Sequence, residues 1–289
     1  MLTNHFLQIF IFLLLSFSTS AQNSLLWEIS ANGLEKPSYI FGTVHLNDPK
    51  FLDLDPSVSE ALNKTDMFAM ELVPDSIDML SLMGTIIMTE GNSIKEMLPD
   101  EYYRKIKDFF DDEIGIPIVL FDNVYPLFLT FMFMDDYSVK KDTLPILDIY
   151  LYKLALEKGK KIRALEKPEE QIDAITSIPV SSQIEILKSE IANLDSNERD
   201  MLQFIELYRK ADLDGLLKAS YDYSANKSFH EELIVKRNKT MFQRCKKLMQ
   251  SYPVFIAVGA LHLPGGKGLL EFFRNDGYAV KAIMPESEK

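Results

Sequence analysis

Cysteine is almost absent from this chain, which has one cysteine, Cys245, among 289 residues. A single thiol cannot form an intramolecular disulfide, and it excludes a zinc site or a redox pair built from cysteines. Glycine and proline are also sparse, at 12 and 13 residues, whereas 47% of the residues are hydrophobic. The composition therefore excludes a disordered or collagen-like chain, and any metal site must use histidine and carboxylate ligands.

Basic residues are fewer than acidic ones, at 31 against 43, which leaves a net charge of −12. This charge repels nucleic acids and anionic membrane surfaces, so we expect no nucleic-acid partner. Beyond its first residues the sequence also lacks an apolar run of the ~20 residues that a membrane-spanning helix needs. We therefore expect no stable membrane insertion of the chain that follows these first residues.

Residues 1–21 contain no Lys, Arg, Asp or Glu and include an apolar run at 6–17, followed by small residues that end at Ala21. This pattern is typical of a secretory signal peptide, although the basic residue that usually precedes the run is missing. An uncleaved membrane anchor is the alternative, but the run is shorter than a bilayer requires. We expect an exported protein, periplasmic or secreted, in which 22–289 form a single domain.

Short β-rich runs at 25–30 and 39–44, separated by the turn dipeptide Asn32-Gly33, predict a β-hairpin. Hydrophobic spacing predicts a mostly helical middle region at about 74–228 and then a long amphipathic helix. The chain closes with a predicted β-loop-α-β unit. Together these features indicate an α/β fold with a central mixed β-sheet and a large helical middle region.

Within the middle region the helical spacing is clearest at 77–88, 101–110 and 117–134, and the last of these is punctuated by Pro117 and Pro126. The long amphipathic helix is expected from about residue 228 to residue 249. Proline residues and a glycine thus mark where several of these helices begin or end.

The sequence Gly-x-x-His-Leu occurs twice, each time at the end of an apolar run, and supplies His45 and His262. Ligands of α/β sheets bind beyond the carboxyl ends of strands, and a glycine before the loop allows close backbone approach. A lone histidine there is more often structural than a metal ligand or general base. Two in the same context favour the functional interpretation, and with one carboxylate they are the minimum for a catalytic metal site.

Glu71 and Glu166 each follow a predicted buried strand, so both carboxylates could enter the same cleft. Glu71 could equally be a solvated charge at a strand end, and Glu166 lies among other charged residues. Arg237, on the long helix, could clamp a carboxylate or stabilise an oxyanion, whereas an exposed helical arginine usually does neither. His230 has no strand-end context, and we interpret it as a surface residue of a helix.

Several common catalytic motifs are absent from the sequence. It contains no His-Glu-x-x-His, no Gly-x-Ser-x-Gly and no Walker-type Gly-Lys-Ser/Thr. These absences argue against a one-helix zinc peptidase, a serine hydrolase of the α/β type and a nucleoside-triphosphate site. The ligands of any metal must therefore converge from distant strands.

The chain resembles the TraB/PrgY/GumN family, which includes the Tiki proteases that act on secreted Wnt proteins. The resemblance covers almost all of the chain after the predicted signal peptide, and one departure is Lys167, where a threonine or similar residue is expected. It rests on the order and spacing of short motifs: Leu26-Trp27-Glu28-Ile29, Gly42-Thr43-Val44-His45, Met70-Glu71-Leu72, Asp148 with Tyr150-Leu151, Leu165-Glu166-Lys167-Pro168-Glu169-Glu170-Gln171, Arg237-Asn238, and Val258-Gly259-Ala260-Leu261-His262-Leu263-Pro264-Gly265.

The resemblance implies a metal-dependent peptidase with His45, His262 and Glu71 as metal ligands, Mn²⁺ or Co²⁺ as the favoured metal and Zn²⁺ as a further candidate. Glu166, or Glu71 if it is not a ligand, would carry the proton, and Arg237 would stabilise the oxyanion or grip the substrate. The partner would be a peptide or protein substrate, and the oligomeric state stays open. A peptide-sequestering protein and a haem- or iron-binding protein are the alternatives.

The first prediction concerns the signal peptide. If Thr19-Ser20-Ala21 is recognised by a signal peptidase, the protein recovered from an exporting host begins at Gln22. Intact-mass spectrometry measures this directly, and a mass that still includes residues 1–21 would contradict cleavage at this position.

Overall fold

The computed structural model describes residues 23–46, 49–76, 78, 82–88, 91–137, 145–223 and 226–285. The predicted signal peptide, residues 1–21, lies outside the described residues. Within the described part of the chain, no helix is long and apolar enough to cross a membrane.

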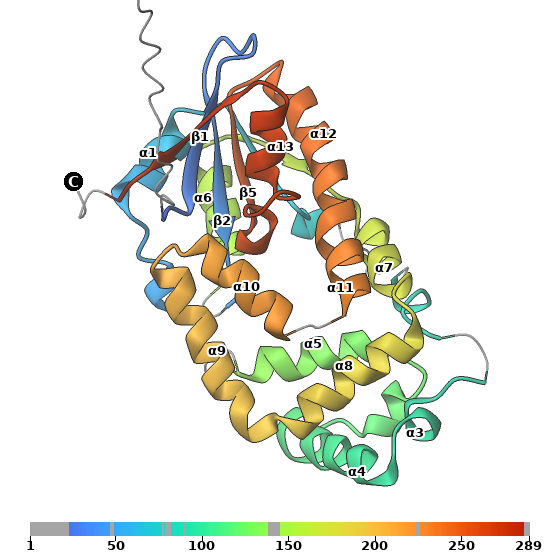
Figure 1. Ribbon diagram of the computed structural model, residues 1–289. Coiled ribbons are helices and arrows are strands. Elements are labelled where there is room, and N and C mark those ends of the chain that lie inside the picture. The colour runs from blue at the N-terminus through green and yellow to red at the C-terminus, as the bar shows by residue number, and fades with distance from the viewer. Residues whose placement is uncertain are drawn as a thin grey trace, which may run out of the picture.

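A six-stranded mixed sheet forms one end of the molecule (Figure 1). Its strand order is β4-β3-β5-β2-β1-β6. The strands β4, β3, β5 and β2 are mutually parallel, while β1 is antiparallel to both β2 and β6. The mixed sheet expected from the sequence is thus confirmed. The strands are β1 (Leu26–Ser30), β2 (Ser38–Thr43), β3 (Met67–Met70), β4 (Lys161–Ala164), β5 (Val254–Gly259) and β6 (Ala279–Ile283).

The predicted hairpin is the β1–β2 pair, in which Leu26 lies opposite Phe41. Its turn places Asn32 at a φ of 48° and Gly33 at 83°. Positive φ angles of this kind are tolerated best by glycine and asparagine, which explains why this dipeptide breaks the two β-rich runs.

Helices cover both faces of the sheet, so its central strands are buried. Helix α6 (Leu147–Glu157) lies behind the sheet in the view of Figure 1, and α12 (Arg237–Met249) and α13 (Leu269–Asn275) lie in front of it. Strand β5 carries five consecutive buried residues, as expected of a strand covered on both sides. Helix α1 (Pro56–Asn63) begins at Asp55, whose side chain accepts a hydrogen bond from the Ser57 backbone N–H at 2.9 Å.

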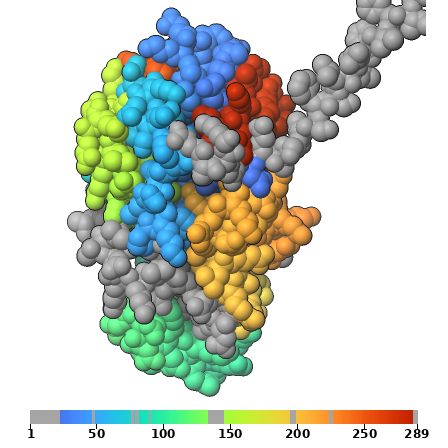
Figure 2. Space-filling model, turned by 90° about the vertical axis from the view of Figure 1, so that its left-hand side faces the viewer, coloured from blue at the N-terminus to red at the C-terminus, as the bar shows by residue number. Residues whose placement is uncertain are grey.

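The middle region forms the other end of the molecule, with a second apolar core of its own built around Ile106, Phe110 and Leu187. Figure 2 shows α9 lying against the segment that precedes α1, and the Tyr208 ring packs edge-on against Phe51 there. The helices of this region are α3 (Ile94–Met97), α4 (Asp100–Phe109), α5 (Pro126–Tyr137), α7 (Pro168–Thr176), α8 (Val180–Ala192), α9 (Leu194–Arg209) and α10 (Leu213–Tyr223).

One sequence prediction in this region needs correction, and another is confirmed. The predicted helix at 77–88 does not reach its end, because Ile87 pairs with Val124 in an isolated β-bridge; residues 77 and 79–81 lie outside the described residues. The predicted helical stretch at 117–134 is interrupted at the two prolines as the sequence indicated: a short 3₁₀ helix, Ile118–Phe121, follows Pro117, and α5 begins at Pro126. Proline lacks the N–H that a continuing helix would need and disfavours a helical residue before it.

The long amphipathic helix is present, but it contains a wider turn. Helix α11 (Lys227–His230) continues into a π-helical segment, Glu231–Lys236, and then into α12. The interpretation of His230 as a surface residue is wrong, because it is only 5% exposed. Its ring stacks on Tyr221 at 3.7 Å, so helix α10, which the sequence analysis did not predict, covers it.

The packing at Gly42 generates the second prediction. A Cβ at this position would lie 2.9 Å from Leu263 Cδ1 and 3.1 Å from Ala260 Cα, and Leu263 is fully buried. Gly42→Ala should therefore reduce the free energy of unfolding by about 1–3 kcal/mol, as overpacked cores do. Gly84→Ala is the matched control because nothing lies within 4 Å of its Cβ position. Denaturant unfolding that gives equal stabilities for the two variants would contradict this.

Candidate active site

The two Gly-x-x-His segments leave neighbouring parallel strands at the same edge of the sheet. Thr43 at the end of β2 lies opposite Gly259 at the end of β5. On the other side of β5, Met70 lies opposite Ala257, so Glu71 follows β3 at the same edge. Parallel register therefore gathers side chains that are as many as 217 residues apart (262 − 45), at the place where ligands of such sheets bind.

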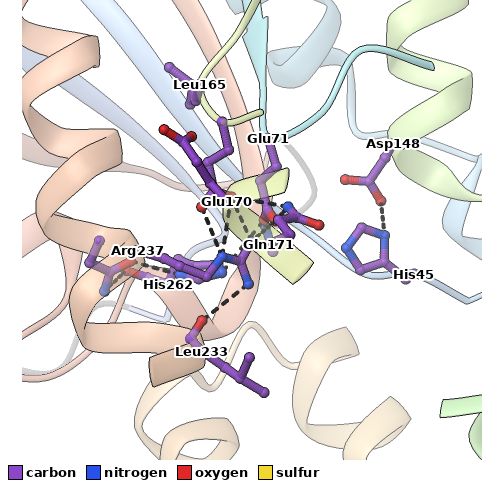
Figure 3. Close-up of polar contacts among 12 residues, drawn as sticks. His45, Glu71, Asp148, Leu165, Glu170, Gln171, Leu233, Arg237 and His262 are labelled. Atoms are coloured by element: carbon purple, nitrogen blue, oxygen red, sulfur yellow. Dashed lines mark hydrogen bonds and ion pairs between the residues drawn. The ribbon is translucent and has the colours of Figure 1, made fainter. Parts of the chain in front are cut away.

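Arg237 joins the two predicted carboxylates at this edge (Figure 3). Its Nη2 lies 2.5 Å from Glu71 Oε2 and 2.7 Å from Glu166 Oε2, and its Nε donates to Glu166 Oε1 at 2.9 Å. Its Nη1 donates to the backbone carbonyl of Leu233 at 3.1 Å. Glu166 is only 3% exposed and Glu71 is 9% exposed. The structure thus brings Glu71, Glu166 and Arg237 into one buried ionic cluster.

Gln171, from α7, is a member of this cluster that the sequence analysis missed as a site residue. Its side-chain amide donates to Glu166 Oε2 at 3.0 Å and lies 3.5 Å from Glu71 Oε2. The Glu166 backbone N–H also donates to the Glu71 carbonyl at 2.9 Å, which ties the two strand ends together. These contacts fix the separation of the two carboxylates.

The second carboxylate oxygen of Glu71 faces His262. Glu71 Oε1 accepts a hydrogen bond from the Gly259 N–H at 2.7 Å and lies 3.7 Å from Nε2 of His262. Burial raises the pKa of Glu71, but positive charge on His262, Arg237 and His45 and the Gly259 N–H outweigh it and lower that pKa to about 2. Burial lowers the pKa of His262 to about 4, so at neutral pH the imidazole is uncharged, and Arg237 is the main cation holding Glu71 ionised.

His262 is fixed from its other side by Asn238, the residue after Arg237 on α12. The Nδ1 atom of His262 lies 2.7 Å from Asn238 Oδ1. Both side chains are buried, with His262 4% exposed and Asn238 fully enclosed. One turn of α12 therefore contacts the carboxylates with one residue and the histidine with the next.

His45 lies beside this cluster and is paired with Asp148 of α6 (Figure 3). Its Nδ1 is 3.0 Å from Asp148 Oδ2, while Asp148 Oδ1 accepts a 2.5 Å hydrogen bond from Thr43. Asp148 Oδ2 is buried and has no hydrogen bond of regular geometry among the described residues, so the contact with His45 is chiefly electrostatic. The Asp148 carboxylate raises the pKa of His45 to about 9, although the imidazole side chain is 59% exposed.

The predicted ligands are thus only partly gathered. His262 and Glu71 face each other, while His45 is held by Asp148. The charges of His45 and Glu71 still shift each other's pKa. Within the ranges that the structure describes, no three His, Cys, Asp or Glu side chains lie close enough together to hold a metal ion. The metal assignment of His45, His262 and Glu71 therefore stays a prediction.

A cavity of about 310 Å³ opens beside the ionic cluster, between α7 and the π-helical segment. Glu166 and Arg237 line it, so the buried cluster is one wall of a space that reaches solvent. The other lining residues are Glu170, Asp173, Ala174, Ser177, Glu232, Lys236 and Thr240.

Comparison with known protein families decides the relationship that the motifs indicated. The model of the TraB/PrgY/gumN family matches residues 25–282, which include every site residue described above. The chain belongs to this family. The family relationship thus spans the whole sheet and the helical middle region.

Curated relatives include the Metalloprotease TIKI2 of Danio rerio, which is 25% identical in a match that covers 93% of this chain and 62% of the relative. The Metalloprotease TIKI1 of Homo sapiens is 26% identical, with 91% and 62% covered. A Metalloprotease TIKI homolog of Nematostella vectensis is 24% identical, with 92% and 68% covered. The chain thus spans about three-fifths of the length of the first two of these relatives.

The third prediction is that His45 titrates far above an ordinary histidine in the metal-free protein. Its raised pKa means that the pairing with Asp148 stabilises the fold fully below pH 6.5 and that this contribution disappears as the pH rises through about 9. Asp148→Asn should return the midpoint to about 6.5 and remove the corresponding slope of stability with pH. NMR titration of the His45 ring and denaturant unfolding at several pH values measure both effects. Equal midpoints in the two proteins would refute the pairing.

Proposed function

We propose that this protein is an exported, single-domain, divalent-metal-dependent hydrolase, and that it is a peptidase. The observation that carries the proposal is the pair formed by Glu71 Oε1 and His262 Nε2. These two buried atoms face each other at 3.7 Å, and the carboxylate is already ionised by its surroundings. Two acceptor atoms at this separation are a favourable position for a cation, because metal bonds to nitrogen and oxygen of about 2.0–2.2 Å span it.

The chemistry of the residues around this pair supports the proposed metal site. Each histidine has its Nδ1 against an acceptor, Asp148 Oδ2 for His45 and Asn238 Oδ1 for His262, so a metal would bind through Nε2; at His45 it would first have to displace the Nε2 proton. Metal-binding histidines commonly hold a carboxylate or amide acceptor with the ring nitrogen that is not bound to metal. His45, His262 and Glu71 would hold the ion, and Mn²⁺ or Co²⁺ is the proposed metal, with Zn²⁺ as a further candidate.

A divalent ion bound at these residues would lower the pKa of a bound water and polarise a substrate carbonyl. Glu166 supports the reaction as the proton carrier, because it lies next to Glu71 and lines the cavity that opens to solvent. Arg237 keeps both carboxylates in position through its shared Nη2, and its charge helps to keep Glu71 ionised. For Arg237 to stabilise an oxyanion, the substrate must compete with these two carboxylates for the guanidinium.

The substrate is proposed to be a peptide or protein, because the curated relatives are named metalloproteases. His45 is the one of the three proposed ligands whose side chain is exposed to solvent, where a substrate would meet it. Export would place the protein where secreted or periplasmic substrates are found. A protein that binds peptides without cleaving them is the outcome that would replace this proposal.

The fourth prediction tests the ligand set. His45→Ala, His262→Ala and Glu71→Gln should each reduce Mn²⁺-dependent peptide hydrolysis at least about a hundredfold, because each removes one of the three proposed ligands of the metal that would activate water. Arg237→Lys should reduce turnover less, since it keeps the charge and loses the planar fork. Cleavage of a peptide library with and without Mn²⁺, followed by mass spectrometry, provides the measurement.

The controls use the same chemical changes away from the site. His230→Ala removes a buried histidine that lies against Tyr221, and Glu170→Gln removes a carboxylate paired with Arg244. Both should lose some thermal stability and retain hydrolysis. If the three ligand variants stay active, the site is structural; if the wild type binds peptides and cleaves none under any metal, the hydrolase proposal fails.

A further inference from the structure

Asn238 is fully buried and makes three polar contacts with one short stretch of chain. Its Nδ2 donates to the backbone carbonyl of Lys267 at 2.8 Å and to that of His262 at 3.2 Å. Its Oδ1 lies 2.7 Å from the His262 Nδ1. All the hydrogen-bonding capacity of the amide nitrogen is therefore used by backbone acceptors.

These contacts fix which way the amide points. A backbone carbonyl carries no hydrogen, so rotating the amide by 180° would place Oδ1 against two other oxygens and lose two hydrogen bonds. The oxygen of Asn238 must therefore face His262 Nδ1, and since it can only accept, Nδ1 must carry the hydrogen. A neutral imidazole has one N–H, so Nε2 of His262 holds a lone pair.

That lone pair is directed at Glu71 Oε1, which can only accept because Glu71 is ionised. Without Asn238 the opposite tautomer would be favoured, because an Nε2–H could donate to the Glu71 carboxylate. The imidazole would then form a stable pair with Glu71 and have no lone pair for a cation at that position. The neutral amide of Asn238 prevents the Nε2–H tautomer and does not draw a second proton onto the ring. A carboxylate in its place would draw that proton.

We propose that Asn238 is a positioning residue that holds His262 in the Nδ1–H tautomer and so keeps Nε2 free to bind a divalent metal. The proposal rests on the metal-dependent function proposed above. It assigns to Asn238 a task separate from that of its neighbour Arg237, which contacts the two carboxylates. The wide π-helical turn before them ends at Lys236, directly before this pair of residues.

The test compares Asn238→Leu with Asn238→Asp. Leucine has a similar size and removes every polar contact, whereas aspartate keeps an acceptor for Nδ1–H and loses both donors to the carbonyls of His262 and Lys267. Met249→Ala, three turns further along α12, is the matched control for a buried side chain shortened on the same helix. If the role of Asn238 is only structural, both Asn238 variants should behave alike.

Long-range ¹H–¹⁵N NMR of the metal-free protein reports the tautomer of His262 directly. We expect the neutral Nδ1–H form in the wild type and in Met249→Ala, and the Nε2–H form in Asn238→Leu. In Asn238→Asp the ring should keep Nδ1–H and also be protonated at Nε2 at neutral pH, because the added carboxylate attracts a proton. Titration with Mn²⁺ alone, followed by the EPR signal of the free ion, should show at least a tenfold weaker binding by Asn238→Leu. Asn238→Asp should bind Mn²⁺ more weakly than the wild type at neutral pH and regain affinity as the pH rises, because the ion must displace the Nε2 proton; its melting temperature should also fall.

The two readouts separate this inference from the proposed function. If the wild type has the expected tautomer and Asn238→Leu reverses it, but no protein binds a divalent ion, Asn238 keeps its positioning role and the metal-dependent function fails. If the wild type binds Mn²⁺ and has the Nε2–H form of His262, the inference is overturned and the function stands. It is also overturned if Asn238→Leu retains both the tautomer and the affinity. Should Asn238→Leu fail to fold, the wild-type spectrum and Asn238→Asp still decide.

Discussion

The ionic cluster around Arg237 is the constraint on which the arrangement of the site depends. Glu71 and Glu166 are nearly excluded from solvent, and one guanidinium is shared between them. Two carboxylates and one arginine leave one unit of negative charge in a buried place, which is costly unless further positive charge compensates it. The Gly259 N–H and the amide of Gln171 supply partial compensation. A cation next to Glu71 Oε1 would complete it, so the electrostatics of the fold and the proposed chemistry favour the same position.

The topology explains how these charges come together. Strands β3, β5 and β2 run in parallel, so the residues that follow them emerge at one edge of the sheet. Helix α12 passes in front of that edge and contributes successive residues to two different partners, the carboxylates and His262. Helix α6, on the opposite face, contributes Asp148 to His45. The site is therefore held by elements from both faces of the sheet, and no single segment of the chain contains it.

The strand-end residues of this site could be predicted from the sequence, because Gly-x-x-His after an apolar run specifies both the edge of the sheet and the close packing. Gly42 shows why: a Cβ there would collide with Leu263 and Ala260 of the second such segment. The sequence assigned no role to the residues that helices contribute to the site, Asp148, Asn238 and Gln171. Helical periodicity predicts which face of a helix is buried, but it does not predict which residues that face contacts. His230 was misjudged for the same reason, because the helix that covers it was not recognised.

The two histidines are held by partners of different charge, and this difference divides their tasks. Asp148 is a carboxylate, which attracts a proton to the exposed His45, whereas the neutral Asn238 leaves the buried His262 uncharged. A cation approaching the pair formed by Glu71 and His262 would find those donors already prepared. At His45 the cation would have to displace a proton from the ring. The charge of the neighbouring Asp148 holds that proton more firmly than a neutral amide would. If the proposed metal binds here, the buried half of the site would provide affinity, and the exposed half would make occupancy depend on pH.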